Sequence, residues 1–199
     1  MFILDKNKKL IIDDRAKFTG SGFDEEYEIG EGSIAYQIIP LVKNVIEIGG
    51  GTGKVSHIIN SVLSERNLQK KHIVIEPGLG NPFFTGKVEH IYKNKDCFND
   101  KYTIISKLAD ELLLEDIQNV FKDEKPDCLF VDCEGCLYSF QNTIVGKYVL
   151  DNVKYIINEM DGYNESIREQ WESNGFKFVV MGYGCGMDCT TEVWVKSND

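Results

Sequence analysis

Residues 45–53 of the chain read Val-Ile-Glu-Ile-Gly-Gly-Gly-Thr-Gly, a short buried-strand pattern that runs directly into a glycine turn. At Gly49, Gly51 and Gly53 the absence of a Cβ lets the backbone turn sharply and come close to a ligand. The acidic residue Glu47 precedes the turn, and a helical pattern follows it. This order of strand, glycine turn and helix predicts a binding loop for a nucleotide-type cofactor.

The spacing of the glycines and the residue at the end of the next strand indicate which class of nucleotide-type cofactor the loop can bind. A dinucleotide fingerprint requires a further glycine at position 54 or 56, depending on the register, and Lys54 and Ser56 stand there instead. The sequence therefore disfavours NAD. The following apolar run, residues 72–75, ends at Glu76. A carboxylate at this place in doubly wound folds accepts both hydroxyls of a ribose, so we expect Glu76 to bind the cofactor's ribose.

Strand and helix patterns alternate along the chain, which predicts a doubly wound α/β fold with a Rossmann-like sheet. The 199 residues are 42% hydrophobic and contain four prolines, so they can form one domain with a full core. We expect a single domain over 1–199, with a small N-terminal β-hairpin and lid-like segment in 1–32 and the core in 33–199. The expected elements are strands at 45–48, 72–76, 88–92, 128–132 and 153–158, helices at 33–41, 54–62, 108–121 and 166–174, and a terminal antiparallel hairpin from 177–183 and 191–195.

The charge and hydropathy patterns limit the partners. The formal net charge is −10, whereas a nucleic-acid groove normally needs a basic surface, so we expect no nucleic-acid partner. No run approaches the roughly 18 apolar residues of a membrane span, and residues 1–6 lack the pattern of a signal peptide. These features predict a cytoplasmic protein with no membrane partner, and they leave its oligomeric state open.

Six cysteines raise the question of a zinc site. Cys133 and Cys136 have C-x-x-C spacing, and Cys185 and Cys189 have C-x-x-x-C spacing. Cysteine also serves as a small apolar residue in and beside buried strands, and disulfides are uncommon in intracellular chains. We therefore expect reduced, structural cysteines and no stoichiometric zinc.

A second motif lies at the end of the strand pattern at 128–132. Residues 132–135 read Asp-Cys-Glu-Gly, and carboxylates at this edge of an open α/β sheet lie where ligands bind. The segment resembles the D-x-E-G motif of the FkbM-type methyltransferases, and residues 108–112 and 153–159 resemble the flanking helix and strand of that family. The resemblance spans roughly residues 45–180. An acidic residue that the family usually carries is replaced here by Leu137, and residues 78–82 are shorter and richer in glycine than the family pattern.

The glycine loop likewise resembles the cofactor site of class I S-adenosylmethionine-dependent methyltransferases. The resemblance implies that S-adenosylmethionine binds along Gly49, Gly51 and Gly53, with Glu47 near its amino-acid end and Glu76 on its ribose. The FkbM-type resemblance implies an O-methyltransferase acting on a hydroxyl of a small molecule or a glycan.

The chemistry of hydroxyl methylation assigns roles to three carboxylates. The acceptor oxygen must be aligned with the methyl group and must lose its proton. Asp132 is the first choice for the base, with Glu134 and Glu159 as neighbours that can share this role. Glu134 can alternatively cap the next helix, and Glu159 can orient the loop that follows it. The three carboxylates can also hold Mg²⁺, which prefers oxygen ligands.

Two other functions remain open on sequence grounds. The acceptor can be a protein or a nucleic acid, which the acidic charge disfavours. The chain can also be a nucleoside-binding module without catalysis, which Leu137 at the acidic position favours.

Overall fold

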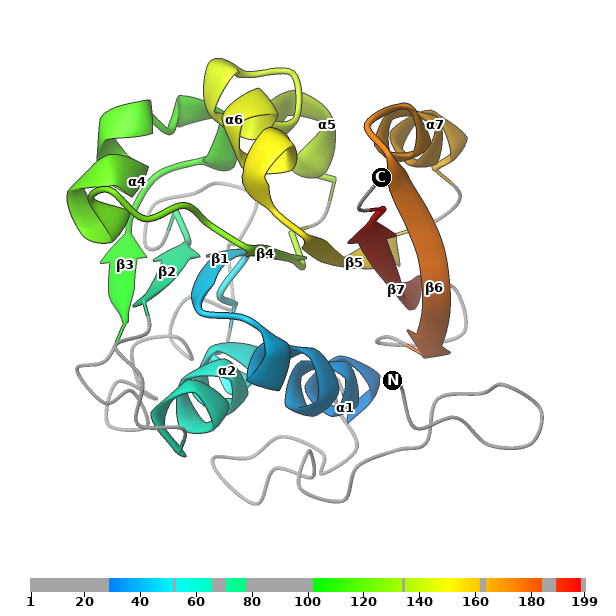
Figure 1. Cartoon of the computed structure of the whole chain (residues 1–199), viewed down its shortest axis with the longest axis horizontal. Helices are drawn as coiled ribbons and strands as arrows, with labels where there is room; N and C mark the ends of the chain where they lie inside the picture. The colour runs from blue at the N-terminus through cyan, green and yellow to red at the C-terminus, as the bar shows by residue number, and fades with distance from the viewer. Residues whose placement is uncertain are drawn as a thin grey trace.

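The computed structural model describes residues 29–51, 53–65, 71–77, 102–133, 135–161, 164–183 and 189–197. The N-terminal hairpin expected within 1–32 falls almost wholly outside these ranges, as do the strand expected at 88–92 and the side chain of Glu134. Within the described residues, a seven-stranded sheet has the order β3-β2-β1-β4-β5-β7-β6 (Figure 1). The expected doubly wound α/β fold is confirmed.

All four strand pairings among β1 to β5 are parallel, and β7 runs antiparallel to both strands beside it. The expected terminal antiparallel hairpin is therefore confirmed. The strands are β1 (Asn44–Ile48), β2 (Lys71–Ile75), β3 (Thr103–Ile105), β4 (Cys128–Val131), β5 (Tyr155–Asp161), β6 (Phe176–Tyr183) and β7 (Cys189–Lys196).

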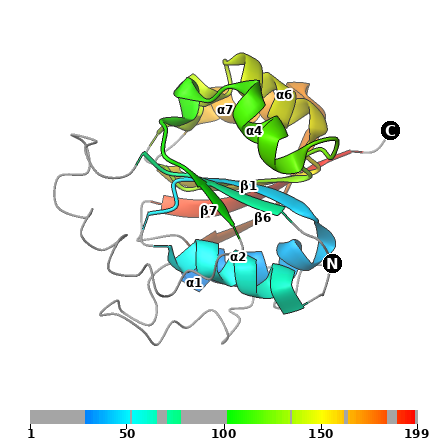
Figure 2. The ribbon, with the colours of Figure 1, turned by 90° about the vertical axis from the view of Figure 1, so that its left-hand side faces the viewer.

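Helices cover both faces of the sheet (Figure 2). On one face lie α1 (Ile29–Ile38), the short helix η2 (Ile39–Leu41) and α2 (Lys54–Glu65). The other face carries η5 (Ala109–Glu111), α4 (Leu114–Phe121), α5 (Leu137–Phe140), α6 (Ile144–Asn152) and α7 (Glu165–Ser173). Among the described residues, none of the helices has the length and apolar character needed to cross a bilayer.

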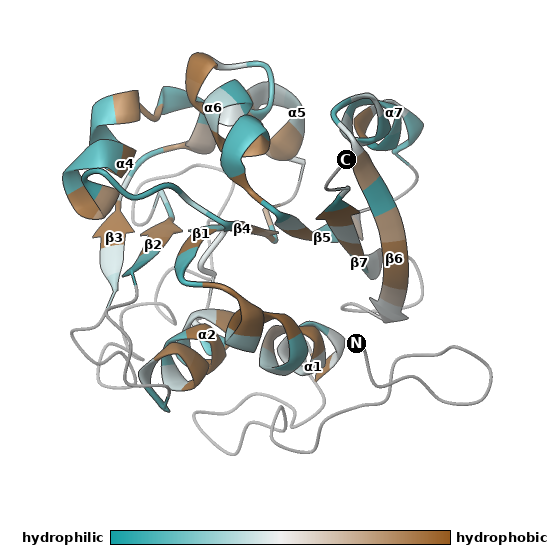
Figure 3. Ribbon diagram, viewed as in Figure 1, coloured by the Kyte–Doolittle hydropathy of each residue, from teal (hydrophilic) through white to brown (hydrophobic). Residues whose placement is uncertain are grey.

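The core consists of two apolar layers, one on each side of the sheet (Figure 3). Alternate residues of one strand enter opposite layers: Val45 packs toward α1 and α2, whereas Ile46 packs toward α4 and α6. Every residue of β1 and of β4 is buried. Burial on both faces is characteristic of parallel sheets, and it leaves the carboxyl ends of the central strands as the place where polar residues gather.

Two helices differ from their expected bounds. The first begins at Ile29 rather than at Ser33 and contains Gly30 and Gly32, both buried. Burial of its apolar residues offsets the low helix propensity of glycine. The segment expected as one helix over 108–121 is a short 3₁₀ turn followed by α4, because the backbone is extended at Leu112 between them. Leu112 is nevertheless buried, so its apolar spacing resembled that of a helix.

Candidate functional site

The glycine turn after β1 is built from left-handed backbone. Gly49, Gly51 and Gly53 have φ values of 89°, 47° and 82°, which favour glycine. At Gly49 a Cβ would lie 1.6 Å from the main-chain oxygen of Asp132. The glycine loop therefore packs directly against the end of β4, and the residue that makes this contact also carries the candidate base. A Cβ at Gly51 would meet no atom within 4 Å, so this part of the loop faces open space.

Glu76 lies against the same loop. It directly follows β2, and its carboxylate accepts a hydrogen bond of 3.1 Å from the Gly51 N–H. The side chain is largely buried, with 6% of its surface exposed. The structure thus brings together Glu76 and the glycine loop, as the strand patterns predicted, and it adds a contact between them that the sequence did not show.

Glu47 has protein partners for both of its carboxylate oxygens. Ser56 Oγ donates to one oxygen at 2.7 Å, and His72 Nε2 lies 2.6 Å from the other. All three side chains are buried. Because Ser56 belongs to α2 and His72 to β2, Glu47 links the strand before the glycine loop to the helix after it and to the neighbouring strand. On sequence grounds, Ser56 served only to exclude a dinucleotide fingerprint, and residue 72 was only the first residue of an expected strand.

Two of the three expected catalytic carboxylates meet at the ends of β4 and β5. Asp132 directly follows β4, its N–H still donating to the Ile48 carbonyl at 2.9 Å, and Glu159 lies in β5. The third member of the group is Glu31, from the first turn of α1. One carboxylate oxygen from each of these residues lies within 4.8 Å of the other two. Glu31 is fully buried and Glu159 is 9% exposed, whereas Asp132 is only partly buried.

Sequence reasoning missed Glu31 because it lies about a hundred positions before Asp132 and belongs to no motif. The hydrophobic pattern of α1 gives no signal either: the helix is buried on most sides, so it has no regular alternation of apolar and polar faces that would mark Glu31 as unusual. The oxygen-only donor set of Glu31, Asp132 and Glu159 fits the ligand preference of Mg²⁺.

A small hollow of about 20 Å³ lies beside Glu159. We call it the β4–β5 pocket. Its wall combines apolar side chains with amides and one carboxylate, and it is lined by Val131, Cys133, Gly135, Leu137, Asn158, Glu159, Met160, Asn164 and Ile167. Leu137, which replaces the acidic residue of the FkbM pattern, therefore forms part of the wall of this pocket.

The cysteines differ from expectation. Cys133 and Cys136 form a disulfide, so the expectation that all cysteines are reduced is wrong for this pair. The pairing follows from the turn after β4, which brings the two Cα atoms to 5.5 Å, a distance that a disulfide spans without strain. Cys128 is a free, buried thiol, and burial raises its pKa well above the usual value. Cys185 and the side chain of Cys189 lie outside the described residues.

At the opposite end of the sheet, Asp127 joins the beginnings of β1 and β4. Its carboxylate accepts from the N–H groups of Lys43 and Asn44 at 2.8 to 3.1 Å. Burial raises the pKa of Asp127, and these hydrogen bonds oppose the rise. This acidic residue is thus structural and stands apart from the carboxylates at the carboxyl ends of the strands.

No protein-family model and no curated protein sequence matches the chain. Solved structures do resemble it. A precorrin-6y C5,15-methyltransferase from Geobacter metallireducens superposes with a TM-score of 0.55 at 15% identity, over 92% of this chain and 96% of that chain. An O-methyltransferase from Bacillus cereus in complex with SAH gives 0.51 at 16% identity, over 83% and 80%.

A third similar structure is a candidate tRNA (m1A22) methyltransferase from Streptococcus pneumoniae in complex with S-adenosyl-L-methionine, with a TM-score of 0.54 at 14% identity over 84% of this chain and 72% of that chain. At such identities the likeness establishes the fold. The chain has the Rossmann-like fold that these methyltransferases share.

Proposed function

We propose that the chain is an S-adenosylmethionine-dependent O-methyltransferase of the FkbM type, acting on a hydroxyl of a small molecule or a glycan. The observation that carries the proposal is the contact between two sites expected from sequence. The glycine loop after β1 packs on the main chain of Asp132, which carries the proposed base. A cofactor along that loop and an acceptor at the carboxylates would therefore be neighbours.

The cofactor half of the site uses the left-handed loop and the strand end beside it. The glycines at 49, 51 and 53 would let the backbone approach the cofactor, and Glu76 would accept hydrogen bonds from the ribose while it holds the Gly51 N–H. S-adenosylmethionine supplies an activated methyl group on a sulfonium. Because both oxygens of Glu47 contact Ser56 and His72, we assign Glu47 to positioning the loop near the amino-acid end of the cofactor.

The acceptor half uses Asp132 as the base. The Asp132 carboxylate would align the acceptor hydroxyl for in-line attack and accept its proton, and bound S-adenosylmethionine would supply the methyl group. Asp132 is the least buried of the three clustered carboxylates, so an acceptor can reach it most readily. Two further carboxylates would orient the acceptor: Glu159, and Glu134 from the D-x-E-G motif that also contains Asp132.

The side chains that line the β4–β5 pocket can contact a small acceptor bound over it, although the pocket's volume of about 20 Å³ does not enclose one. Its apolar side chains suit the C–H faces of a sugar or another ring, and Asn158, Asn164 and Glu159 can hydrogen-bond hydroxyl groups. Glu31, Asp132 and Glu159 together can also hold Mg²⁺, which would position an acceptor oxygen. The similar structures include candidate RNA and tRNA methyltransferases as well as O-methyltransferases, so they do not decide the acceptor. The expected lack of nucleic-acid binding stays a prediction.

Binding of S-adenosylhomocysteine, measured by calorimetry, tests the cofactor assignment. We expect micromolar affinity for the wild type and a loss of about 1 to 3 kcal/mol for Glu76→Ala, the range for a hydrogen bond to a charged group. Glu76→Gln can still accept from Gly51 but lacks the charge, so it separates support of the loop from contact with the ligand. Glu115→Ala, an exposed glutamate of α4, is the matched control and should bind normally. Tight NADH binding without binding of S-adenosylhomocysteine would contradict the assignment.

Methyl transfer from labelled cofactor to a panel of sugars, phenols, peptides and tRNA tests the acceptor class. Labelling of sugars or small hydroxyl compounds supports the proposal. Labelling of tRNA or peptides alone would replace it with a macromolecular methyltransferase, and cofactor binding without transfer to any acceptor would favour a binding module.

A further inference from the structure

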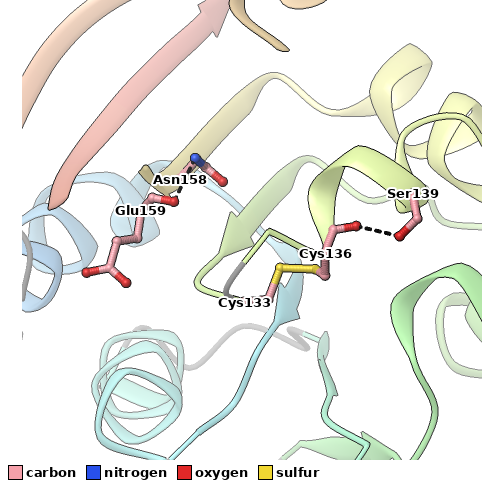
Figure 4. Close-up of a disulfide and its surroundings, with 5 residues drawn as sticks. All are labelled: Cys133, Cys136, Ser139, Asn158 and Glu159. Atoms are coloured by element: carbon pink, nitrogen blue, oxygen red, sulfur yellow. Dashed lines mark hydrogen bonds between the residues drawn. A yellow bond between two sulfur atoms is a disulfide. The ribbon is translucent and has the colours of Figure 1, made fainter. Parts of the chain in front are cut away.

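The disulfide between Cys133 and Cys136 closes the turn that joins β4 to α5 (Figure 4). Gly135 lies within this turn with a φ of 85°. The N–H of Cys136 donates to the carbonyl of Cys133 at 2.9 Å, and the carbonyl of Cys136 accepts from Ser139 Oγ at 3.0 Å. Cys136 is thus joined to the first turn of α5, and the disulfide ties that helix to the strand end.

The disulfide lies where both halves of the proposed site meet. Cys133 directly follows Asp132 and lines the β4–β5 pocket together with Glu159. Its Cβ would lie 3.0 Å from a Cβ placed on Gly49, so it also borders the glycine loop. A change in the bonding of Cys133 therefore acts on the wall of the pocket and on the chain segment that carries the proposed base, Asp132.

The location and accessibility of the pair suit reversible chemistry. Both Cys133 and Cys136 are partly exposed, whereas the free thiol of Cys128 is fully buried in β4. A dithiol can reach an exposed disulfide, and exchange depends on such access. The loop between the two cysteines is short. Because loop-closure entropy grows with loop length, this disulfide restrains the unfolded chain much less than a long-range one would.

We propose that Cys133 and Cys136 form a reversible redox site that controls the shape of the β4–β5 pocket, with a dithiol as the reductant. One thiolate of the dithiol attacks a sulfur of the disulfide, forms a mixed disulfide and releases the other cysteine as a thiol. The second thiol of the reductant then displaces the remaining cysteine. Two electrons pass to the protein pair, which becomes two thiols, and the reductant leaves as its own disulfide.

Reduction frees α5 from the end of β4, so the wall formed by Cys133, Gly135 and Leu137 loosens. The expected effect of reduction on methyl transfer rests on the proposed function, because the β4–β5 pocket is the proposed acceptor site. The cofactor loop is held separately by Glu76 and by Glu47 with its partners. Cofactor binding is therefore expected to survive reduction, whereas acceptor binding is expected to weaken.

The chain of 199 residues is equilibrated in buffers with graded ratios of reduced to oxidised dithiothreitol, alkylated, and mapped by mass spectrometry. We expect a reversible transition of the Cys133–Cys136 pair under native conditions, with Cys128 unlabelled throughout. Hydrogen–deuterium exchange of the same samples should be about tenfold faster over 132–141 in the reduced form and unchanged over 44–51 and 53–65. Calorimetry should give the same affinity for S-adenosylhomocysteine in both forms.

Variants separate the disulfide from its surroundings. The double variant Cys133→Ser, Cys136→Ser should exchange like the reduced wild type whatever the dithiol ratio. Ser139→Ala removes the neighbouring hydrogen bond but keeps both sulfurs, so it should retain the response to dithiol. If the double variant does not fold, the reduced wild type supplies the same comparison.

Two results would overturn the proposal: a disulfide that is reduced only after denaturation, or a reduced form whose exchange over 132–141 matches the oxidised form. If S-adenosylhomocysteine binds neither form while exchange still responds to dithiol, the redox site stands and the proposed methyltransferase function fails.

Discussion

Replacing Gly49 by alanine tests how the glycine loop is held against β4. The backbone at Gly49 has a φ of 89°, and an L-residue in left-handed backbone costs about 1 to 2 kcal/mol. The new Cβ would also lie 1.6 Å from the carbonyl oxygen of Asp132. That oxygen belongs to backbone, and the Asp132 N–H is hydrogen-bonded to Ile48 at 2.9 Å. Relief of the clash therefore requires separation of the ends of β1 and β4.

We expect Gly49→Ala to lower the free energy of unfolding by about 4 kcal/mol or more, a size that arises when a mutation breaks a defined structural feature. Gly51→Ala is the matched control. Its backbone is also left-handed, with a φ of 47°, but a Cβ there meets no atom within 4 Å. We expect it to lose only about 1 to 2 kcal/mol, the cost of the backbone conformation alone.

Urea denaturation followed by circular dichroism measures both variants. With a slope of about 2 to 3 kcal/mol per molar, the midpoint of Gly49→Ala should fall by about 1.5 M or more, and that of Gly51→Ala by less than about 1 M. A variant that is unfolded without urea agrees with the expectation. Equal midpoints for the two variants would refute the claim that the loop packs rigidly on the main chain of Asp132.

Three further outcomes are expected. Asp132→Asn should reduce the methyl-transfer rate by about 10² to 10⁴-fold, as loss of a general base does, and should leave the affinity for S-adenosylhomocysteine within a few-fold of the wild type. Near-native turnover would refute the assignment. A strong effect of EDTA or added Mg²⁺ on the wild-type rate would indicate that these carboxylates bind a metal instead. Hydrogen bonds from Lys107 and from the Leu113 N–H lower the pKa of Asp116, so its charged form stabilises the fold above the usual aspartate pKa near 4, and this contribution is lost as the pH falls through the lowered pKa. Asp116→Asn should therefore flatten the stability profile below about pH 5 in acid denaturation, and an unchanged profile would exclude this role. Elemental analysis should find no stoichiometric zinc, whereas zinc that survives dialysis and is lost on Cys185→Ser would establish a metal site.

Local patterns in the sequence were enough to predict the main elements that form the site. The apolar run before Gly49, the glycine turn and the following helical spacing predicted β1, the loop and α2, because these features depend on residues close in the chain. The ends of β2 and β4 placed Glu76 and Asp132 at one edge, because the carboxyl ends of parallel strands lie together. The terminal antiparallel pair followed from alternating strand patterns around a glycine-rich turn.

Tertiary structure decided which side chains meet. Both faces of β1 are buried, so alternation could not reveal that Glu47 contacts Ser56 and His72 inside the protein. Glu31 joins the carboxylates of Asp132 and Glu159 only because α1 packs on one face of the sheet with its first turn near the ends of β4 and β5.

The pairing of the cysteines was also decided by the fold. The C-x-x-C spacing is compatible with zinc ligands, free thiols or a disulfide, and the turn after β4 selects the last by bringing the Cα atoms of Cys133 and Cys136 to 5.5 Å. Sequence determined the local elements and the order of the strand ends, since those depend on propensity and periodicity. The partners of Glu47, the third carboxylate and the disulfide depend on distances between segments, which only the folded chain defines.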